Sequence, residues 1–323
     1  MRAAVFERYG GAGEVRIAEL AAPRPSSTEL LVEVAACGMN PKDAWVRSGA
    51  FRLLTGRRFP KQTGSDFCGR VVVAGARADL RPGATVFGYL NHLGGGAAAE
   101  LLNVPSAWSA VVPYGLDCVV AASLPCAYLT ALQCLRDRGG LAPGMRVMIY
   151  GASGGVGTAA TQLARHFGAH VTTVCSESNV AYCRVNGAHE ALAYDADDVF
   201  AGQAAFDIVF KVFAGDAAAG TKAWKLLAPR GVFVDLAGNP LSNAAGALQR
   251  ALGRPSRASH IVRARRTDLE LIARLALEGA VRPAIEVLPF EEVAAAHARV
   301  ESAHTRGKLV LKIQAGQRSA RKE

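Results

Sequence analysis

The chain has 323 residues and a formal net charge of +10, with 50% hydrophobic and 20% charged residues. This length exceeds the size at which one hydrophobic core usually stops growing, so two globular domains are expected, and the apolar composition excludes disorder. The first residues, MRAAVFERYGGAGE, contain acidic residues and glycines where a signal peptide would have an apolar stretch. No apolar run in the sequence is long enough to cross a membrane. We therefore expect a cytoplasmic protein with no membrane span.

Up to residue 105 the chain consists of short extended segments separated by glycine and proline. The strand-like runs are RAAVFE, ELLVEVAACG, GRVVVAGA, ATVFGYL and AELLNVP. An all-β module is the expectation. The following segment, 119–137, is apolar and compatible with a helix, interrupted only by Pro125. We place the first domain at 1–121 and the second at 122–264.

From residue 146 onward, apolar strands alternate with segments of helical length. Strands are predicted at VMIYG, HVTTVC, EALAY, FDIVFKVF and GVFVDLAG, and helices over 156–167, 180–186 and 217–227. Such alternation predicts an α/β domain with a doubly wound parallel sheet covered on both faces. After residue 259 come HIVRA, a helix over 267–278, AIEVLPF, a helix over 291–300 and GKLVLKI. We assign 265–323 back to the first domain.

The cysteines and the basic residues limit the possible partners. Seven cysteines are scattered singly, with no C-x-x-C pair, which predicts reduced thiols. Arginines crowd segment 250–266, and the tail ends in Arg318, Arg321 and Lys322. A basic surface can bind RNA or an anionic membrane, but no aromatic residues interleave these arginines. We favour a solvated face that also attracts an anionic cofactor, with no nucleic-acid partner.

The strongest chemical pattern is RVMIYGASGGVG at 146–157, which reads as a buried strand, a glycine-rich turn and the start of a helix. Glycine lets the backbone approach a pyrophosphate, whose charge lies at the amino end of the helix. The spacing departs from G-x-G-x-x-G, but a strand, a helix and a second strand follow in the required order. We expect dinucleotide binding by Gly151, Ser153, Gly154, Gly155, Val156 and Gly157.

Cofactor choice is expected to be decided just after HVTTVC, where NAD sites place a carboxylate against the ribose. Ser176 stands there instead. A small polar residue accepts a 2′-phosphate that a carboxylate would repel, which favours NADPH, while Glu177 beside it keeps NADH open. Ser176 could equally cap the next helix.

The chain resembles the medium-chain dehydrogenase/reductase superfamily over residues 1–313, and most closely its quinone oxidoreductase branch. The resemblance is carried by the glycine-rich segment, the strand HVTTVC and GKLVLKI, together with ACGMNPKDAWVRSG, GSDFCGRVV and PGATVFG. The resemblance implies a GroES-like substrate domain, a Rossmann NAD(P)-binding domain and a cleft between them for nicotinamide and substrate. It also implies a homodimer formed through edge strands of the Rossmann sheet, for which FKVF or VFVDLA would serve.

Zinc enzymes of this superfamily carry cysteine and histidine at two catalytic metal segments. Here the corresponding triplets are GMN at 38–40 and GSD at 64–66, which lack the thiolate and imidazole that zinc requires. We therefore expect no metal. Hydride transfer without a Lewis acid suits activated acceptors such as quinones, enones and enoyl thioesters.

The resemblance also implies roles for individual residues. Asn40 and Asp43 match the polar pair near nicotinamide and substrate, and either could hydrogen-bond the developing enolate or hydroquinone oxygen. Trp45, where relatives have tyrosine, and Phe51 are assigned to the acceptor pocket. The other implied cofactor contacts are Thr130, Ser176, Tyr194, Phe213, Ala237, Gly238 and Lys308. Trp45 and Phe51 could instead be core residues, and Asn40 could only hold the loop backbone.

The resulting hypothesis is a zinc-independent, NADPH-dependent oxidoreductase that transfers hydride to a quinone or another conjugated carbonyl acceptor. The first alternative is an enoyl-thioester or enone reductase of a biosynthetic pathway. The second belongs to another class: a non-catalytic NADPH-binding protein that uses segment 250–266 to bind RNA or a membrane surface.

Overall fold

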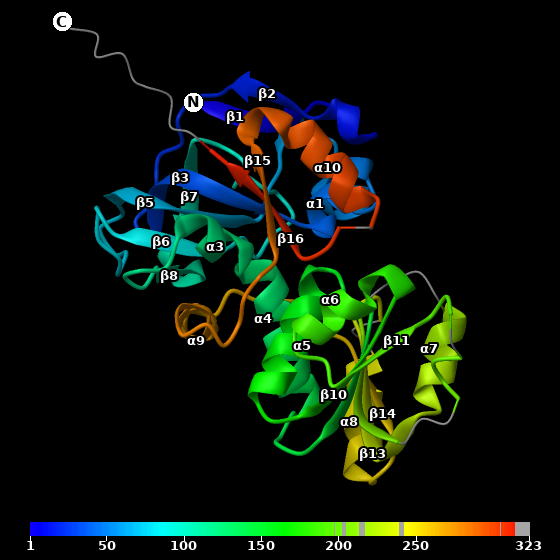
Figure 1. Ribbon diagram of the computed structural model, residues 1–323. Coiled ribbons are helices and arrows are strands. Elements are labelled where there is room, and N and C mark those ends of the chain that lie inside the picture. The colour runs from blue at the N-terminus through cyan, green and yellow to red at the C-terminus, as the bar shows by residue number, and fades with distance from the viewer. Residues whose placement is uncertain (197, 202–204, 213–216, 239–241, 304, 314–323) are drawn as a thin grey trace, which may run out of the picture. The chain divides into compact units, whose positions relative to one another are not determined.

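The computed structural model describes residues 1–196, 198–201, 205–212, 217–238, 242–303 and 305–313 (Figure 1). The chain divides into two compact units. Unit 1 comprises Met1–Cys126, Ala264–Leu277 and the described part of Ile285–Glu323, and unit 2 comprises the described parts of Ala127–Arg263 and Glu278–Ala284. In the described part of the chain, no helix combines the length and the hydropathy needed to cross a membrane.

Unit 1 is built on a seven-stranded sheet in the order β15-β16-β3-β5-β6-β8, with β7 paired to β3. Its strands are β3 (Glu29–Met39), β5 (Asp66–Ala74), β6 (Thr85–Tyr89), β7 (Leu101–Pro105), β8 (Ser109–Val111), β15 (Ile285–Pro289) and β16 (Lys308–Lys312). A second sheet contains β2 (Arg16–Glu19), β1 (Arg2–Phe6) and β4 (Lys61–Gln62). Because β16 pairs antiparallel with β3, the last strand lies in the sheet of unit 1.

Unit 1 also contains a helix that the all-β prediction omitted, α1 (Pro41–Ser48). Asn40 precedes it in extended backbone, Pro41 occupies its first turn, and the Asp43 carboxylate accepts the Asn40 N–H at 2.9 Å. Gly49, at φ 88°, ends the helix in the left-handed conformation. The other helices of this unit are α2 (Arg52–Thr55), α3 (Cys118–Ser123), α9 (Arg266–Leu277) and α10 (Val293–Glu301).

Unit 2 is built on a parallel six-stranded sheet in the order β11-β10-β9-β12-β13-β14. Its strands are β9 (Arg146–Tyr150), β10 (His170–Cys175), β11 (Glu190–Ala193), β12 (Phe206–Lys211), β13 (Leu227–Asp235) and β14 (Ser256–Ala258). The helices are α4 (Pro125–Gln133), which carries the chain over from unit 1, α5 (Gly155–His166), α6 (Val180–Val185), α7 (Ala217–Trp224) and α8 (Ser242–Ala251). Figure 1 shows α5 and α7 on opposite sides of this sheet, which confirms the predicted doubly wound arrangement.

The order of the strands in the unit 2 sheet contradicts the expectation that FKVF or VFVDLA lies at a sheet edge and forms the dimer contact. The first two residues of FKVF belong to β12 and the first four of VFVDLA to β13. Both strands are interior, since β12 lies between β9 and β13, and β13 between β12 and β14. The prediction that they are edge strands is therefore wrong. Apolar runs identify strands but do not order them within a sheet.

Two cysteines form a disulfide. Cys68 in β5 bonds to Cys118 at the start of α3, with Cα atoms 5.7 Å apart and a sequence separation of 50. The prediction that all thiols are reduced is wrong for this pair. Isolated cysteines carry no information about which helix packs on which strand, so the spacing could not reveal the bond.

His297 on α10 makes the stability of unit 1 sensitive to acid. Its side chain is completely buried, with Nε2 at 2.9 Å from Thr63 Oγ1. Burial lowers the pKa of His297 from 6.5 to about 3, with a smaller contribution from the Arg47 cation. The imidazole of His297 therefore binds a proton more tightly in the unfolded chain than in the folded one. The contribution of neutral His297 to stability is complete above pH 6.5 and is lost as pH falls toward about 3.

We expect the free energy of unfolding to fall by roughly 3 kcal/mol between about pH 6.5 and about pH 4 through His297, at about 1.4 kcal/mol per pH unit. Urea unfolding across this range, compared between the wild type and His297→Gln, isolates the contribution. An equal fall in both proteins would contradict the prediction.

Candidate functional site

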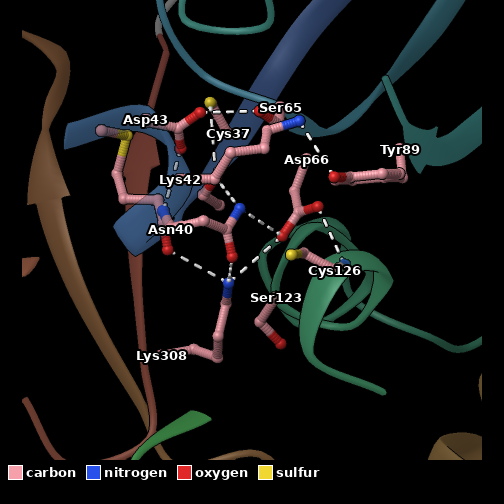
Figure 2. Close-up of polar contacts among 12 residues, drawn as sticks. Cys37, Asn40, Lys42, Asp43, Ser65, Asp66, Tyr89, Ser123, Cys126 and Lys308 are labelled. Atoms are coloured by element: carbon pink, nitrogen blue, oxygen red, sulfur yellow. Dashed lines mark hydrogen bonds and ion pairs between the residues drawn. The ribbon is translucent and has the colours of Figure 1, made fainter. Parts of the chain in front are cut away.

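Five buried polar residues meet in unit 1, where β3 ends beside the start of β5 and the start of β16 (Figure 2). Antiparallel pairing of these strands brings their ends together. None of the five is more than 5% exposed. We call this set the polar cluster; its members are Asn40, Asp43, Ser65, Asp66 and Lys308.

The Lys308 ammonium lies in the middle of the polar cluster. Its Nζ donates to the Met39 carbonyl at 3.1 Å, to Asn40 Oδ1 at 2.6 Å and to Asp66 Oδ2 at 3.2 Å. Asn40 Nδ2 also donates to Asp66 Oδ2, at 3.0 Å, and the Cys126 N–H donates to Asp66 Oδ1 at 2.9 Å. The buried carboxylate is thus balanced by a cation and by two further donors, as a buried charge requires.

Asp43 is held from two sides. Ser65 Oγ donates to its Oδ1 at 2.6 Å, and the Asn40 N–H donates to its Oδ2. Burial raises the pKa of Asp43, partly opposed by the Lys42 cation. Burial likewise raises the pKa of Asp66, partly opposed by Lys308. Both carboxyl groups are therefore more easily protonated than a carboxyl group in water.

Lys42 extends away from the polar cluster toward Tyr89 (Figure 2). Its Nζ donates to the Tyr89 hydroxyl at 2.9 Å and to the Leu90 carbonyl at 3.3 Å, and it lies 4.4 Å from the centre of the Tyr89 ring. Sequence reasoning missed this contact and the Lys308–Asp66 pair. The only local signal was a lysine between Asn40 and Asp43.

The structure brings Asn40 and Asp43 together, but the polar atoms of both side chains already have partners. Asn40 Nδ2 donates to Asp66 and, at 3.3 Å, to the Gly38 carbonyl. This saturation suits residues that position their neighbours. Trp45, assigned by resemblance to the acceptor pocket, is 49% exposed, so it is not a core residue, and Phe51 is partly buried.

The glycine loop of unit 2 follows β9 and leads into α5. Gly151 has φ +86°, and Gly154 is the N-cap residue of α5. A Cβ on Gly157 would lie 2.3 Å from the Gly151 carbonyl oxygen, so only glycine allows the helix to approach the loop this closely. A Cβ on Gly154 would have no neighbour within 4 Å. The loop is therefore tightly packed on one side and open at the amino end of the helix, the geometry of a phosphate cradle.

Ser176 directly follows β10 and makes no side-chain cap hydrogen bond, so the capping alternative is not what the structure shows. Its Oγ accepts from Asn179 Nδ2 at 2.7 Å and lies 3.2 Å from Ser178 Oγ. Tyr194 is 53% exposed, with its ring centroid 6.5 Å from that of Tyr150. Hydroxyl and amide groups thus gather where the second strand of the dinucleotide pattern ends.

The remaining assigned residues are also in unit 2. Thr130 is buried on α4. Ala237 and Gly238 follow β13, and their N–H groups donate to Asp235, at 3.0 Å to Oδ1 and at 3.1 Å to the carbonyl. Phe213 lies outside the described residues.

Comparison with known proteins places this geometry in a family. The alcohol dehydrogenase GroES-like domain model matches residues 26–114, and the zinc-binding dehydrogenase model matches 186–311. The chain is 31% identical to the mitochondrial NAD(P)H oxidoreductase RTN4IP1 of Mus musculus, over 88% of this chain and 82% of that protein.

The chain belongs to the medium-chain dehydrogenase/reductase superfamily. Within it the chain lies in the quinone oxidoreductase-like branch. It is 34% identical to the chloroplast envelope quinone oxidoreductase homolog of Arabidopsis thaliana, over 60% of this chain and 61% of that relative, so it spans less than two thirds of the relative's length. The quinone oxidoreductase from Coxiella burnetii superposes with a TM-score of 0.88 at 27% identity, over 97% of this chain and 99% of that one.

The printed names of these relatives are NAD(P)H oxidoreductase and quinone oxidoreductase homolog. The predicted fold class, a GroES-like domain with a Rossmann domain, is confirmed.

The zinc ion named in one family model does not fit the polar cluster. Zinc sites use thiolate, imidazole and carboxylate ligands. The cluster instead presents an amide, a hydroxyl and the Lys308 ammonium, which lies 3.2 Å from Asp66 and would repel a metal cation there. Among the described residues no group of three or more His, Cys, Asp or Glu side chains could hold a metal. Metal analysis of the purified protein tests this directly.

Proposed function

We propose that this protein is a zinc-independent, NADPH-dependent oxidoreductase that reduces quinones or other conjugated carbonyl compounds. The observation that carries the proposal is the polar cluster, in which a buried lysine ammonium lies between Asn40 and Asp66 where zinc relatives would hold their metal. The open glycine loop of unit 2 supports a dinucleotide cofactor.

NADPH would be held by the loop from Gly151 to Gly157, with Ser176 and Tyr194 beside its 2′-phosphate and with NADH as the alternative. When bound, this cofactor supplies the hydride. Thr130, Ala237 and Gly238, together with Phe213 outside the described residues, are proposed to line the nicotinamide site. The chain's own contribution is binding and orientation, which can lower a barrier by about 7 kcal/mol or more when the geometry is ideal.

Reduction of a quinone or enone places negative charge on the carbonyl oxygen, and the polar cluster is suited to stabilise it. The weakest hydrogen bond of Asn40 is the one from Nδ2 to the Gly38 carbonyl, at 3.3 Å. We propose that Asn40 exchanges this bond for one to the acceptor oxygen, while Lys308 and Asp43 hold its side chain and backbone in place. A buried donor of this kind is more effective than one in water, because it needs no reorganisation. Trp45 and Phe51 would contact the acceptor, and water would deliver the final proton.

The test is NADPH oxidation measured with a benzoquinone and with a crotonyl thioester. Faster turnover of the quinone supports the proposal, and faster turnover of the thioester supports an enoyl-thioester reductase. NADPH binding without turnover of either compound would favour the non-catalytic class.

The basic segment 250–266 gives that non-catalytic class little support. Arg250 donates to the carbonyl of Arg138, and the Arg257 guanidinium lies 4.7 Å from the centre of the Trp224 ring. Arg266 bonds to Asp79 and, at 2.9 Å, to the Ser109 carbonyl. These arginines stabilise the fold itself. Arg318, Arg321 and Lys322 lie outside the described residues.

Location and assembly are further proposals. We retain the cytoplasmic location, although the names of two relatives refer to a chloroplast envelope and to mitochondria. We also retain the homodimer, which gel filtration tests.

Replacing Ser176 with aspartate should shift cofactor preference. We expect Ser176→Asp to lower the ratio of NADPH to NADH affinity about tenfold, because a carboxylate repels the 2′-phosphate and accepts from a ribose hydroxyl instead. Fluorescence titration with both cofactors measures the ratio. Ser176→Ala, which removes the hydroxyl without adding charge, is the control. An unchanged ratio in the aspartate variant would place the 2′-phosphate elsewhere.

A further inference from the structure

A loop of unit 1, residues 51–58, exposes apolar and basic side chains together. α2 forms its first turn, and there Leu53 is 94% exposed and Leu54 is 77% exposed. Arg52, Arg57 and Arg58 are also exposed. Adjacent large apolar side chains at such exposure are unusual on a protein surface and indicate a binding partner. We refer to this segment as the 51–58 loop.

The 51–58 loop is anchored at its base, so the exposure of the leucines follows from the fold. The Tyr9 hydroxyl lies 2.7 Å from Thr55 Oγ1 and donates to the Gly56 carbonyl. Lys61 Nζ donates to the Thr55 carbonyl at 2.7 Å. These bonds fix the backbone after α2, while Leu53 and Leu54 remain in solvent.

The charge on the 51–58 loop is entirely positive. Segment 44–65 contains no aspartate or glutamate. Within the part of the chain that the structure describes, no carboxylate pairs with Arg52, Arg57 or Arg58. Three unneutralised cations beside two exposed leucines call for a partner that is anionic at its surface and apolar just beneath it.

α8 in unit 2 offers a matched comparison. Leu248 in α8 and Leu252 just after it are 64% and 60% exposed, but the neighbouring Arg250 donates to the carbonyl of Arg138. These leucines are exposed much as Leu53 and Leu54 are, but the Arg250 side chain beside them already makes a hydrogen bond within the fold. Arg254, which follows Leu252, is exposed and has no side-chain partner among the described residues, while Arg257 lies against the Trp224 ring. The 51–58 loop differs in having three unpaired arginines beside its two leucines.

We propose that the 51–58 loop docks this protein on an anionic lipid surface. Leu53 and Leu54 enter the boundary between headgroups and acyl chains, and Arg52, Arg57 and Arg58 meet the lipid phosphates. An acidic protein would satisfy the arginines but would need its own apolar pocket for the leucines, whereas an anionic bilayer supplies both layers. The inference does not depend on the reductase activity proposed above.

Co-sedimentation of the full chain with vesicles tests the docking. The wild type should bind phosphatidylglycerol vesicles at least about tenfold more tightly than phosphatidylcholine vesicles, and added salt should weaken the binding. Leu53→Ser/Leu54→Ser and Arg57→Gln/Arg58→Gln should each lower this binding about tenfold, with unchanged thermal melting. The control Leu248→Ser/Leu252→Ser should bind as the wild type does.

Three results would overturn the proposal. The first is equal binding to both lipids, or sedimentation with neither. The second is loss of binding in the α8 control while the loop variants still bind. The third is a dimer in gel filtration that only the Leu53→Ser/Leu54→Ser variant loses, since this would identify a second copy of the chain as the occupant.

Discussion

Gly154→Val should weaken NADPH binding by about 100-fold or more and leave the fold intact. Gly154 has φ −75° and ψ 174°, a conformation that valine adopts freely, and a Cβ there would have no neighbour within 4 Å. The new side chain therefore fills only the space into which a pyrophosphate would enter. Hydrogen bonds to charged groups contribute about 1.5–3 kcal/mol each, so the loss of two accounts for the expected change.

Gly11 provides a matched control for this substitution. It lies in unit 1 at φ −77° and ψ 175°, is also an N-cap residue, and a Cβ added to it would likewise meet nothing within 4 Å. Gly11→Val should melt as Gly154→Val does and bind NADPH as the wild type does, measured by calorimetric titration and thermal unfolding. Wild-type affinity in Gly154→Val would show that the loop does not hold the phosphates.

Gly157→Ala should behave in the opposite way. Its Cβ would lie 2.3 Å from the Gly151 carbonyl oxygen and 2.5 Å from Ala152 Cα, so the helix and the loop must separate. Melting temperature and cofactor binding should then fall together. The contrast between Gly154 and Gly157 separates the glycine that makes room for a ligand from the glycine that makes room for the fold.

Sequence periodicity predicted the Rossmann unit well for a physical reason. Strands buried on both faces, such as β9 and β12, contain runs of consecutive apolar residues, VMIY and IVF, and this pattern is visible without any knowledge of the neighbouring strands. The order of those strands depends on crossovers, so the assignment of β12 and β13 to the sheet edge was wrong. Helix α1 was missed although its Asn-Pro-x-Asp start is a local signal, because the strands on either side suggested an all-β module.

The candidate site was predictable only in part. Asn40 and Asp43 are three residues apart in one segment, ACGMNPKDAWVRSG, and the resemblance of that segment to the family identified both. The partner of Lys308 could not be found this way, because 242 residues separate it from Asp66 and only the pairing of β16 with β3 brings the two together. The Cys68–Cys118 disulfide was not predicted because its two cysteines are likewise far apart in the sequence. Contacts that depend on which strands pair in a sheet cannot be predicted from the spacing of residues that are near one another in the sequence.

Lys308→Met should lower the free energy of unfolding by roughly 3–5 kcal/mol near neutral pH, because it leaves the buried Asp66 carboxylate without its cation. Asn40 Oδ1 also loses its donor. Urea unfolding measures the effect. The double variant Lys308→Met/Asp66→Asn leaves neither member of this ion pair charged, so most of the stability should return, and the two substitutions should couple strongly in a double-mutant cycle.

The pH dependence of Lys308→Met provides a second test of the pair. Burial raises the pKa of Asp66 and Lys308 opposes that rise, so removing the lysine should raise the pKa further. A folded-state pKa above the unfolded value gives stability that is present in acid and is lost as pH rises through the folded pKa. The deficit of Lys308→Met relative to the wild type should therefore shrink as pH is lowered from neutral toward about 4. A deficit that is constant across this range, or additive in the double variant, would mean that Lys308 stabilises the fold by packing and not by neutralising Asp66.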